Sequence, residues 1–111
     1  MNFLKTLKVT KNLILLHTTS EYPTTSSDVN LKVISKLSES FNILTGFSDH
    51  TVDDIASLGA VALGACVIEK HFTLNRTMKG TDHAFSLEPQ GMQKLVRDIT
   101  RTQIALGDGN K

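Results

Sequence analysis

The sequence has few of the residues that would cross-link the chain or attract it to a charged surface. It contains one cysteine, Cys66, so no disulfide can form within the chain, which agrees with a reducing compartment. We expect Cys66 to pack as a small core residue. Twelve basic residues against 11 acidic ones leave a net charge of +1, which provides no basic surface for nucleic acid or for an anionic membrane.

Long apolar stretches are also missing. The longest uncharged run, residues 55–68, has 14 residues, fewer than the roughly 18 of a membrane-spanning helix. The first eight residues include two lysines and no extended apolar core, unlike a secretory signal. We therefore expect a cytoplasmic protein with neither nucleic acid nor a membrane as partner.

Three short apolar runs, each followed by a helical pattern, make up most of the sequence. We expect residues 13–16, 43–48 and 66–72 to be strands, the first of them covered on both faces as in a parallel sheet. Apolar residues at helical spacing run from Val29 to Phe41 after the first strand. This order predicts an α/β fold with parallel strands joined by right-handed crossovers.

Two further helices have recognisable ends. Asp53 or Asp54 can cap a second helix, which Gly64 is expected to end. Pro89 suits the first turn of a third helix. We expect the buried face of that last helix to consist of Met92, Leu95, Val96, Ile99 and Leu106.

Ligands of parallel α/β sheets bind beyond the carboxyl ends of the strands, and all three runs end in polar residues. Strand alternation places His50 and His71 on the same face of neighbouring strands. Two such histidines could hold one divalent metal ion with open positions, or each could be an ordinary hydrogen-bonded histidine. His17 lies on the face of the first strand opposite Thr18 and Ser20, which favours a structural role. We expect His83, in a loop, either to be structural or to support the residues of the site from behind.

Several other polar residues near these ends have two interpretations. The hydroxyls of Ser20 and Ser48 could donate to a phosphate or carboxylate, and Tyr22 could orient a hydroxylated substrate. Alternatively, these residues could cap loops and the helix that follows. Asp82 could bind sugar hydroxyls or a metal, or could close an Asx-turn. Lys70 is expected on the helix-facing side with its ammonium group in solvent.

Seven blocks of the sequence, in this order, resemble the sialic acid synthase family. They are TSEYPT at 19–24, DVNL at 28–31, GFSDHT at 46–51, AVALGA at 60–65, IEKHFT at 68–73, GTDH at 80–83 and SLEP at 86–89. The family fold is a (β/α)8 TIM barrel followed by a small antifreeze-like domain. The resemblance implies that residues 1–111 are an incomplete barrel, a parallel (βα)3 segment matching its last three units, without the antifreeze-like domain.

The family's activity gives the resemblance a chemical meaning. Its members condense phosphoenolpyruvate with N-acetylmannosamine or a related sugar to N-acetylneuraminate or a related nonulosonic acid, and release phosphate. They use a divalent metal, typically Mn²⁺ with Mg²⁺ or Co²⁺ as alternatives, and the full-length enzymes are expected to be homodimers. The implied mechanism is metal-assisted carbon–carbon bond formation at C3 of phosphoenolpyruvate, then water addition at C2 and loss of phosphate.

The resemblance also assigns roles to particular residues. His50 and His71 match the metal ligands, and Ser48 matches a position that contacts phosphoenolpyruvate. Ser20 and Tyr22 match ligand-contacting positions, although Ser20 stands where some members have asparagine. Asp82 matches an acidic residue that contacts the acceptor sugar, and it is the candidate catalytic residue.

The chain is too short to be a complete enzyme of this family. A complete barrel needs about 250 residues, so we expect a fragment of a synthase whose activity belongs to the whole enzyme. Its first and last strands would be exposed sheet edges. The alternative is a catalytically inactive remnant, or a binding or assembly module that pairs with an upstream fragment.

Overall fold

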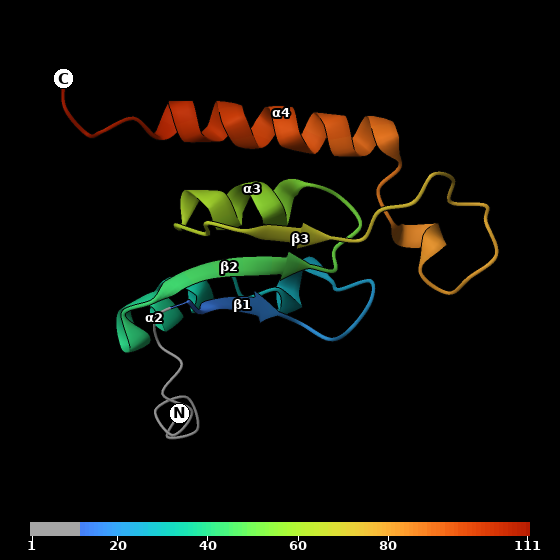
Figure 1. Cartoon of the computed structure of the whole chain (residues 1–111), viewed down its shortest axis with the longest axis horizontal. Coiled ribbons are helices and arrows are strands. Elements are labelled where there is room, and N and C mark those ends of the chain that lie inside the picture. The colour runs from blue at the N-terminus through green and yellow to red at the C-terminus, as the bar shows by residue number, and fades with distance from the viewer. Residues whose placement is uncertain (1–11) are drawn as a thin grey trace.

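The computed structural model describes residues 12–111, which form a three-stranded parallel sheet with helices packed on one side (Figure 1). The strands, in spatial order, are β1 (Ile14–Thr18), β2 (Leu44–Asp49) and β3 (Ile68–Lys70). The helices that follow them in turn are α2 (Lys32–Phe41), α3 (Ile55–Ala62) and α4 (Pro89–Leu106), and the short 3-10 helices are η1 (Ser26–Asp28) and η2 (His83–Phe85). The predicted α/β fold with a parallel sheet is confirmed.

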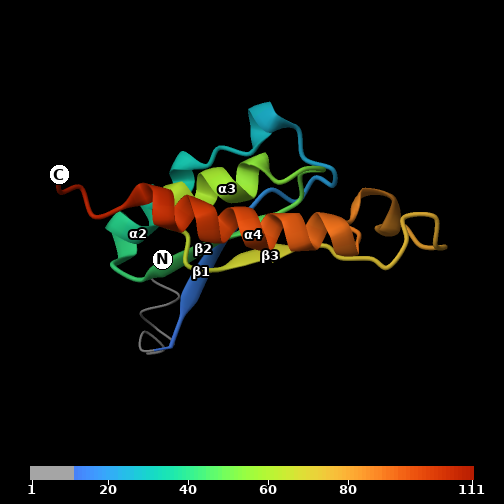
Figure 2. The same ribbon diagram turned by 90° about the horizontal axis from the view of Figure 1, so that it is seen from above.

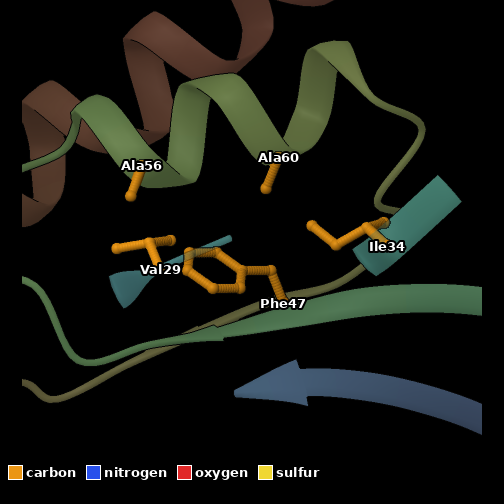
Figure 3. Packing of buried hydrophobic residues seen from close by; sticks show 5 residues of the cluster. All are labelled: Val29, Ile34, Phe47, Ala56 and Ala60. Atoms are coloured by element: carbon orange, nitrogen blue, oxygen red, sulfur yellow. The ribbon is translucent and has the colours of Figure 1, made fainter. Parts of the chain in front are cut away.

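The hydrophobic core lies between β2 and the two helices that cover it. Phe47, on the helix-facing side of β2, packs with Ile34 of α2 and with Ala56 and Ala60 of α3 (Figure 3). The two alanines are four residues apart, so they share one face of the helix. Because their side chains are small, α3 can lie close to the ring of Phe47.

Helix α4 forms an outer layer on α3 (Figure 2). It begins at Pro89 as predicted. Leu95 is buried, but Val96 is 58% exposed and Leu106 is 52% exposed, so their predicted burial is wrong. The reason is that α4 packs mainly against α3 within residues 12–111, and this contact covers a narrower stripe than the apolar pattern. Among the helices of this part of the chain, none combines the length and apolar composition that crossing a bilayer demands.

The face of the sheet opposite the helices is open in the described part of the chain. Ile14 is 41% exposed and Leu16 is 36% exposed, and Leu44 on the same face is 62% exposed. The prediction that the first strand is covered on both faces is therefore wrong. The described helices cover only the side on which Phe47 lies, so these side chains have no covering layer there.

The strand and helix ends differ from prediction by a few residues. Strand β3 is shorter than the predicted 66–72, and Cys66, which precedes it, is exposed rather than part of the core. The Cys66 amide already donates to the Thr45 carbonyl oxygen of β2 (2.8 Å), but Cys66 lies at the edge of the described sheet, where its side chain is exposed. Asp54 occupies the N-cap position of α3 without a side-chain cap hydrogen bond, while the carboxylate of the preceding Asp53 accepts from the Ile55 amide (3.1 Å). Gly64 follows the helix with φ 97°.

Candidate functional site

The polar residues that follow the three strands lie at the carboxyl end of the sheet, where the arrows in Figure 1 point. This end is called the carboxyl edge below. The strand register pairs Thr18 with Ser48, and Ser48 with Glu69. The residues that follow each strand therefore meet at this edge. The predicted convergence of polar residues beyond the strands is confirmed.

His50 and His71 come together at this edge, directly after β2 and β3. Their ring centroids are 5.2 Å apart and the rings are nearly perpendicular, at 79°. Nδ1 of His50 donates a hydrogen bond to the Thr19 carbonyl oxygen (2.7 Å). Because a carbonyl can only accept, the proton sits on Nδ1 and Nε2 presents a lone pair. This arrangement, one ring nitrogen bonded to a carbonyl and the other free, is typical of metal-binding histidines.

Tyr22 packs against both histidines from the loop after β1. Its ring stacks on His71 at a centroid distance of 4.4 Å and makes a T-shaped contact with His50 at a centroid distance of 5.6 Å. Its hydroxyl donates to the Asp82 carbonyl oxygen (3.1 Å) and lies 3.2 Å from Oγ of Ser86. Tyr22 thus links the loop after β1 to both rings and to the loop after β3.

Ser86 is a residue that the sequence did not single out. It is buried, and its hydroxyl donates to the Asp82 carbonyl oxygen (2.5 Å). The carboxylate of Asp82 stays 60% exposed, with Oδ2 3.9 Å from Nδ1 of His71, beyond hydrogen-bond distance. Ser86 and Tyr22 therefore hold the backbone of Asp82, while its exposed carboxylate accepts only a long hydrogen bond from the Thr81 hydroxyl (3.4 Å) among the described residues. The only sequence signal for Ser86 was its place in the SLEP block.

The loop that carries Asp82 is fastened at two further points. Nδ1 of His83 lies 2.7 Å from the hydroxyl of buried Thr73, and Nε of Arg76 donates to the Ser86 carbonyl oxygen (2.9 Å). His83 thus holds the loop that carries Asp82, in agreement with a structural or supporting role. His17 has its predicted structural role, since its Nε2 bonds to the Val29 carbonyl oxygen (2.6 Å) and its ring stacks on Phe47.

The two serines predicted to bind ligands occupy different environments. Ser48 is buried and its hydroxyl donates to Oε1 of Glu69 (2.6 Å), so this hydroxyl already has an acceptor. Ser20 is exposed in the loop between Thr19 and Tyr22. Glu69 itself is exposed at the site, where its carboxylate adds a negative charge close to Ser48.

The donor atoms at this edge suit a divalent metal ion with exchangeable positions. Across residues 12–111, no group of three or more His, Cys, Asp or Glu side chains is placed to hold a metal together. Two imidazoles that leave the remaining positions to water or substrate oxygens are a donor set of the kind found at open metal sites. His50 and His71 fit such an ion, and other ligands would be water or substrate.

The prediction for Lys70 is wrong. Its side chain is only 3% exposed, and Nζ lies 3.0 Å from Oδ2 of Asp49, whose side chain is fully buried. Alternation correctly places Lys70 on the helix-facing side. The ammonium group does not reach solvent because Asp49, on the same side of β2, offers a carboxylate that α3 covers.

The sequence of the chain is similar to a known protein family and to several characterised enzymes. The model of the NeuB family matches residues 1–111. The chain is 52% identical over 101 residues to the N,N'-diacetyllegionaminic acid synthase of Campylobacter jejuni, covering 91% of this chain and 30% of that protein. It is 46% identical to the human N-acetylneuraminate-9-phosphate synthase, covering 90% of this chain and 28% of that enzyme.

A solved structure shows the same arrangement of elements. The sialic acid synthetase of Leptospira borgpetersenii, crystallised with citrate, superposes with a TM-score of 0.82 at 42% identity, covering 87% of this chain and 34% of that one. The chain therefore spans about a third or less of the length of these relatives.

Proposed function

The chain belongs to the NeuB family, and on that basis we propose that it carries part of the active site of a synthase that condenses phosphoenolpyruvate with an N-acetylated hexosamine. N-acetylmannosamine or a related sugar is the proposed acceptor, and the product is N-acetylneuraminate or a related nonulosonic acid, with phosphate released. The observation that carries this proposal is the meeting of His50, His71 and Tyr22 at the carboxyl edge of the sheet. The three strand–helix units are proposed to be the last three of a (β/α)8 barrel.

His50 and His71 are proposed to hold a divalent cation, Mn²⁺ in preference to Mg²⁺ or Co²⁺. Lewis-acid polarisation of the acceptor's aldehyde oxygen is the chemistry that such an ion supplies. The Thr19 carbonyl keeps the proton on Nδ1 of His50 and so presents Nε2 at the site. Tyr22 covers one face of the His71 ring and limits the access of water there.

Four residues are proposed to contact substrates. The Ser48 hydroxyl, now bonded to Glu69, exchanges this acceptor for an oxygen of phosphoenolpyruvate. Ser20 and Tyr22 line the approach to the histidines. The exposed carboxylate of Asp82 accepts hydrogen bonds from hydroxyls of the acceptor sugar.

These positions suit a two-stage reaction. C3 of phosphoenolpyruvate forms a bond to the aldehyde carbon of the acceptor, whose oxygen becomes a hydroxyl. Water then adds at C2, and the tetrahedral carbon that results expels phosphate to leave the 2-keto acid. Asp82 orients the acceptor and Ser48 the donor in this scheme, and the remaining groups are proposed to come from the rest of the barrel.

Metal binding by the purified chain tests the proposal. We expect His50→Ala and His71→Ala each to weaken Mn²⁺ binding at least tenfold in a calorimetric titration, since even supporting residues of metal sites cost about 10–100-fold. His83→Gln is the matched control, because His83 bonds to Thr73 away from the two rings. Unchanged Mn²⁺ affinity in both His50 and His71 variants would contradict the proposed site.

A second candidate function is an assembly module that pairs with further strands. In residues 12–111, β1 and β3 each have one neighbouring strand, and the face carrying Ile14, Leu16 and Leu44 is exposed. Incubating the chain with phosphoenolpyruvate, N-acetylmannosamine and Mn²⁺ separates this role from catalysis by the chain alone. We expect no 2-keto acid in that assay; robust product would show that these three units suffice.

A further inference from the structure

Asp49 and Lys70 form a buried network directly below the two histidines. Oδ1 of Asp49 accepts hydrogen bonds from the Thr51 amide (2.8 Å) and the Thr51 hydroxyl (2.7 Å). Oδ2 accepts from the Ser57 hydroxyl (2.5 Å) and pairs with Nζ of Lys70 (3.0 Å). Both oxygens of this buried carboxylate are therefore engaged, by Thr51 in the loop after β2, by Ser57 of α3 and by Lys70 of β3.

Lys70 connects both neighbours of His50. Besides Asp49, its ammonium group donates to the Thr51 carbonyl oxygen (2.7 Å). Lys70 immediately precedes His71 in the chain, while Asp49 and Thr51 immediately precede and follow His50. Lys70, the neighbour of His71, thus bonds to both residues that flank His50.

The place of this network in the sheet explains what it can do. Asp49 and Lys70 are register partners, and they are the last residues of β2 and β3. The regular backbone pairing of the two strands stops there, one residue before each imidazole. Beyond that point, the side chains of Asp49 and Lys70 supply the connection between the two strand ends that the ladder no longer provides.

We propose that Asp49 and Lys70 are positioning residues that set the separation and orientation of the His50 and His71 rings. Their relevance to metal binding rests on the proposed function of these rings. A buried ion pair often stabilises no more than apolar residues of the same volume, so stability alone does not account for the pair. Its directional bonds to Thr51 and Ser57 account for it as a geometric constraint.

The test uses the double variant Asp49→Asn/Lys70→Met, which removes both charges and leaves neither partner buried alone. In metal-free protein, NMR of wild type should show an Nδ1-protonated His50 and a contact between the two rings. We expect the double variant to lose the ring contact and to bind Mn²⁺ at least tenfold more weakly. The control is Lys94→Met, which breaks the ion pairs of Lys94 with Asp54, just before α3, and with Asp98, within α4, and which should retain both signals.

A double variant that keeps the ring contact, the His50 tautomer and wild-type Mn²⁺ affinity would overturn the proposal. If the double variant fails to fold, a measurement on wild type replaces it. Slow exchange of the Lys70 ammonium protons with water is expected if the network is formed, and fast exchange would overturn the proposal. The metal-free signals also separate this proposal from the proposed function. If Mn²⁺ does not broaden the histidine signals of wild type, the proposed metal site is wrong. The ring contact in metal-free protein still tests the positioning role of Asp49 and Lys70.

Discussion

Gly46 shows how closely the strands approach one another below the histidines. It lies in the middle of β2, on the same face as Ser48. A β-carbon at Gly46 would lie 2.5 Å from Cδ2 of Leu16 and 2.6 Å from the backbone oxygen of Val67. The second contact is with backbone, which cannot rotate away, so any larger residue must push β3 outward.

We expect Gly46→Ala to destabilise the fold by about 1–3 kcal/mol, the usual cost of overpacking. Urea unfolding followed by circular dichroism measures this change. Gly59→Ala is the matched control: its β-carbon would meet only the flexible end of Leu31 at 2.8 Å, and alanine gains about 0.5–1 kcal/mol over glycine within a helix. A Gly46→Ala variant as stable as the Gly59→Ala control would contradict this account.

Individual side chains were predictable where strand alternation alone decides the outcome. His50 and His71 share a face because the side-chain period of a strand is two, and the structure confirms that they meet. Lys70 could not be placed correctly in the same way. Alternation gives the face of a side chain, but whether its end reaches water depends on Asp49 and on the position of α3.

A cluster of charges on α4 is joined by one ion pair to the residue just before α3. Asp98 accepts a hydrogen bond from Nε of Arg97 (2.8 Å) and pairs with Lys94 (3.1 Å), while Lys94 also bonds to Asp54 just before α3. The hydrogen bond from Arg97, followed by that from Lys94, lowers the pKa of Asp98 from 3.8 to about 2. The hydrogen bond to Asp54, followed by that to Asp98, raises the pKa of Lys94.

This cluster predicts an acid-sensitive contribution of Asp98 to the stability of α4. Because the pKa of Asp98 is lower in the folded state, its contribution is complete above about pH 4 and is lost as the pH falls towards 2. We expect thermal stability, followed by circular dichroism, to fall over this range more steeply in wild type than in Asp98→Asn.

Comparison of the two proteins removes the effect of the other carboxylates, which are common to both. High salt should reduce the difference, since these side chains lie near the surface. Parallel pH profiles for wild type and Asp98→Asn would contradict this role of Asp98.

The ends of the helices could be predicted from local sequence more closely than the faces that the helices bury. Pro89 begins α4 and Gly64 follows α3 as predicted, because both residues act through their own backbone conformation. The buried face of α4 could not be predicted as well. An apolar pattern shows which residues can be buried, but Val96 is exposed because the contact with α3 is narrower than that pattern.

The molecule as described has one covered and one open sheet face. Phe47 and the helices fill one side (Figure 3), and Ile14, Leu16 and Leu44 are exposed on the other. Exposed strand edges and apolar surface favour pairing with other chains. The proposed assembly module and the proposed place of the chain in a barrel both use these open strand edges and this exposed apolar face.

We expect the purified chain to self-associate through this face, with a sedimentation coefficient that rises with concentration. Leu44→Lys should lower the association constant at least tenfold, because a charge would then be buried in the contact. Leu74→Lys is the control, since Leu74 is 72% exposed in the loop after β3. Equal association by both variants, or a monomer at all concentrations, would contradict the use of this face.

The sequence by itself determined the order of strands and helices, the parallel sheet and the face on which His50 and His71 lie. These follow from periodicity and backbone preference, which act over a few neighbouring residues. Only the tertiary structure decided that Tyr22 stacks on His71, that Ser86 holds Asp82, and that Lys70 is buried against Asp49. Such contacts join residues distant in the chain, and their distances depend on how closely the strands and helices pack.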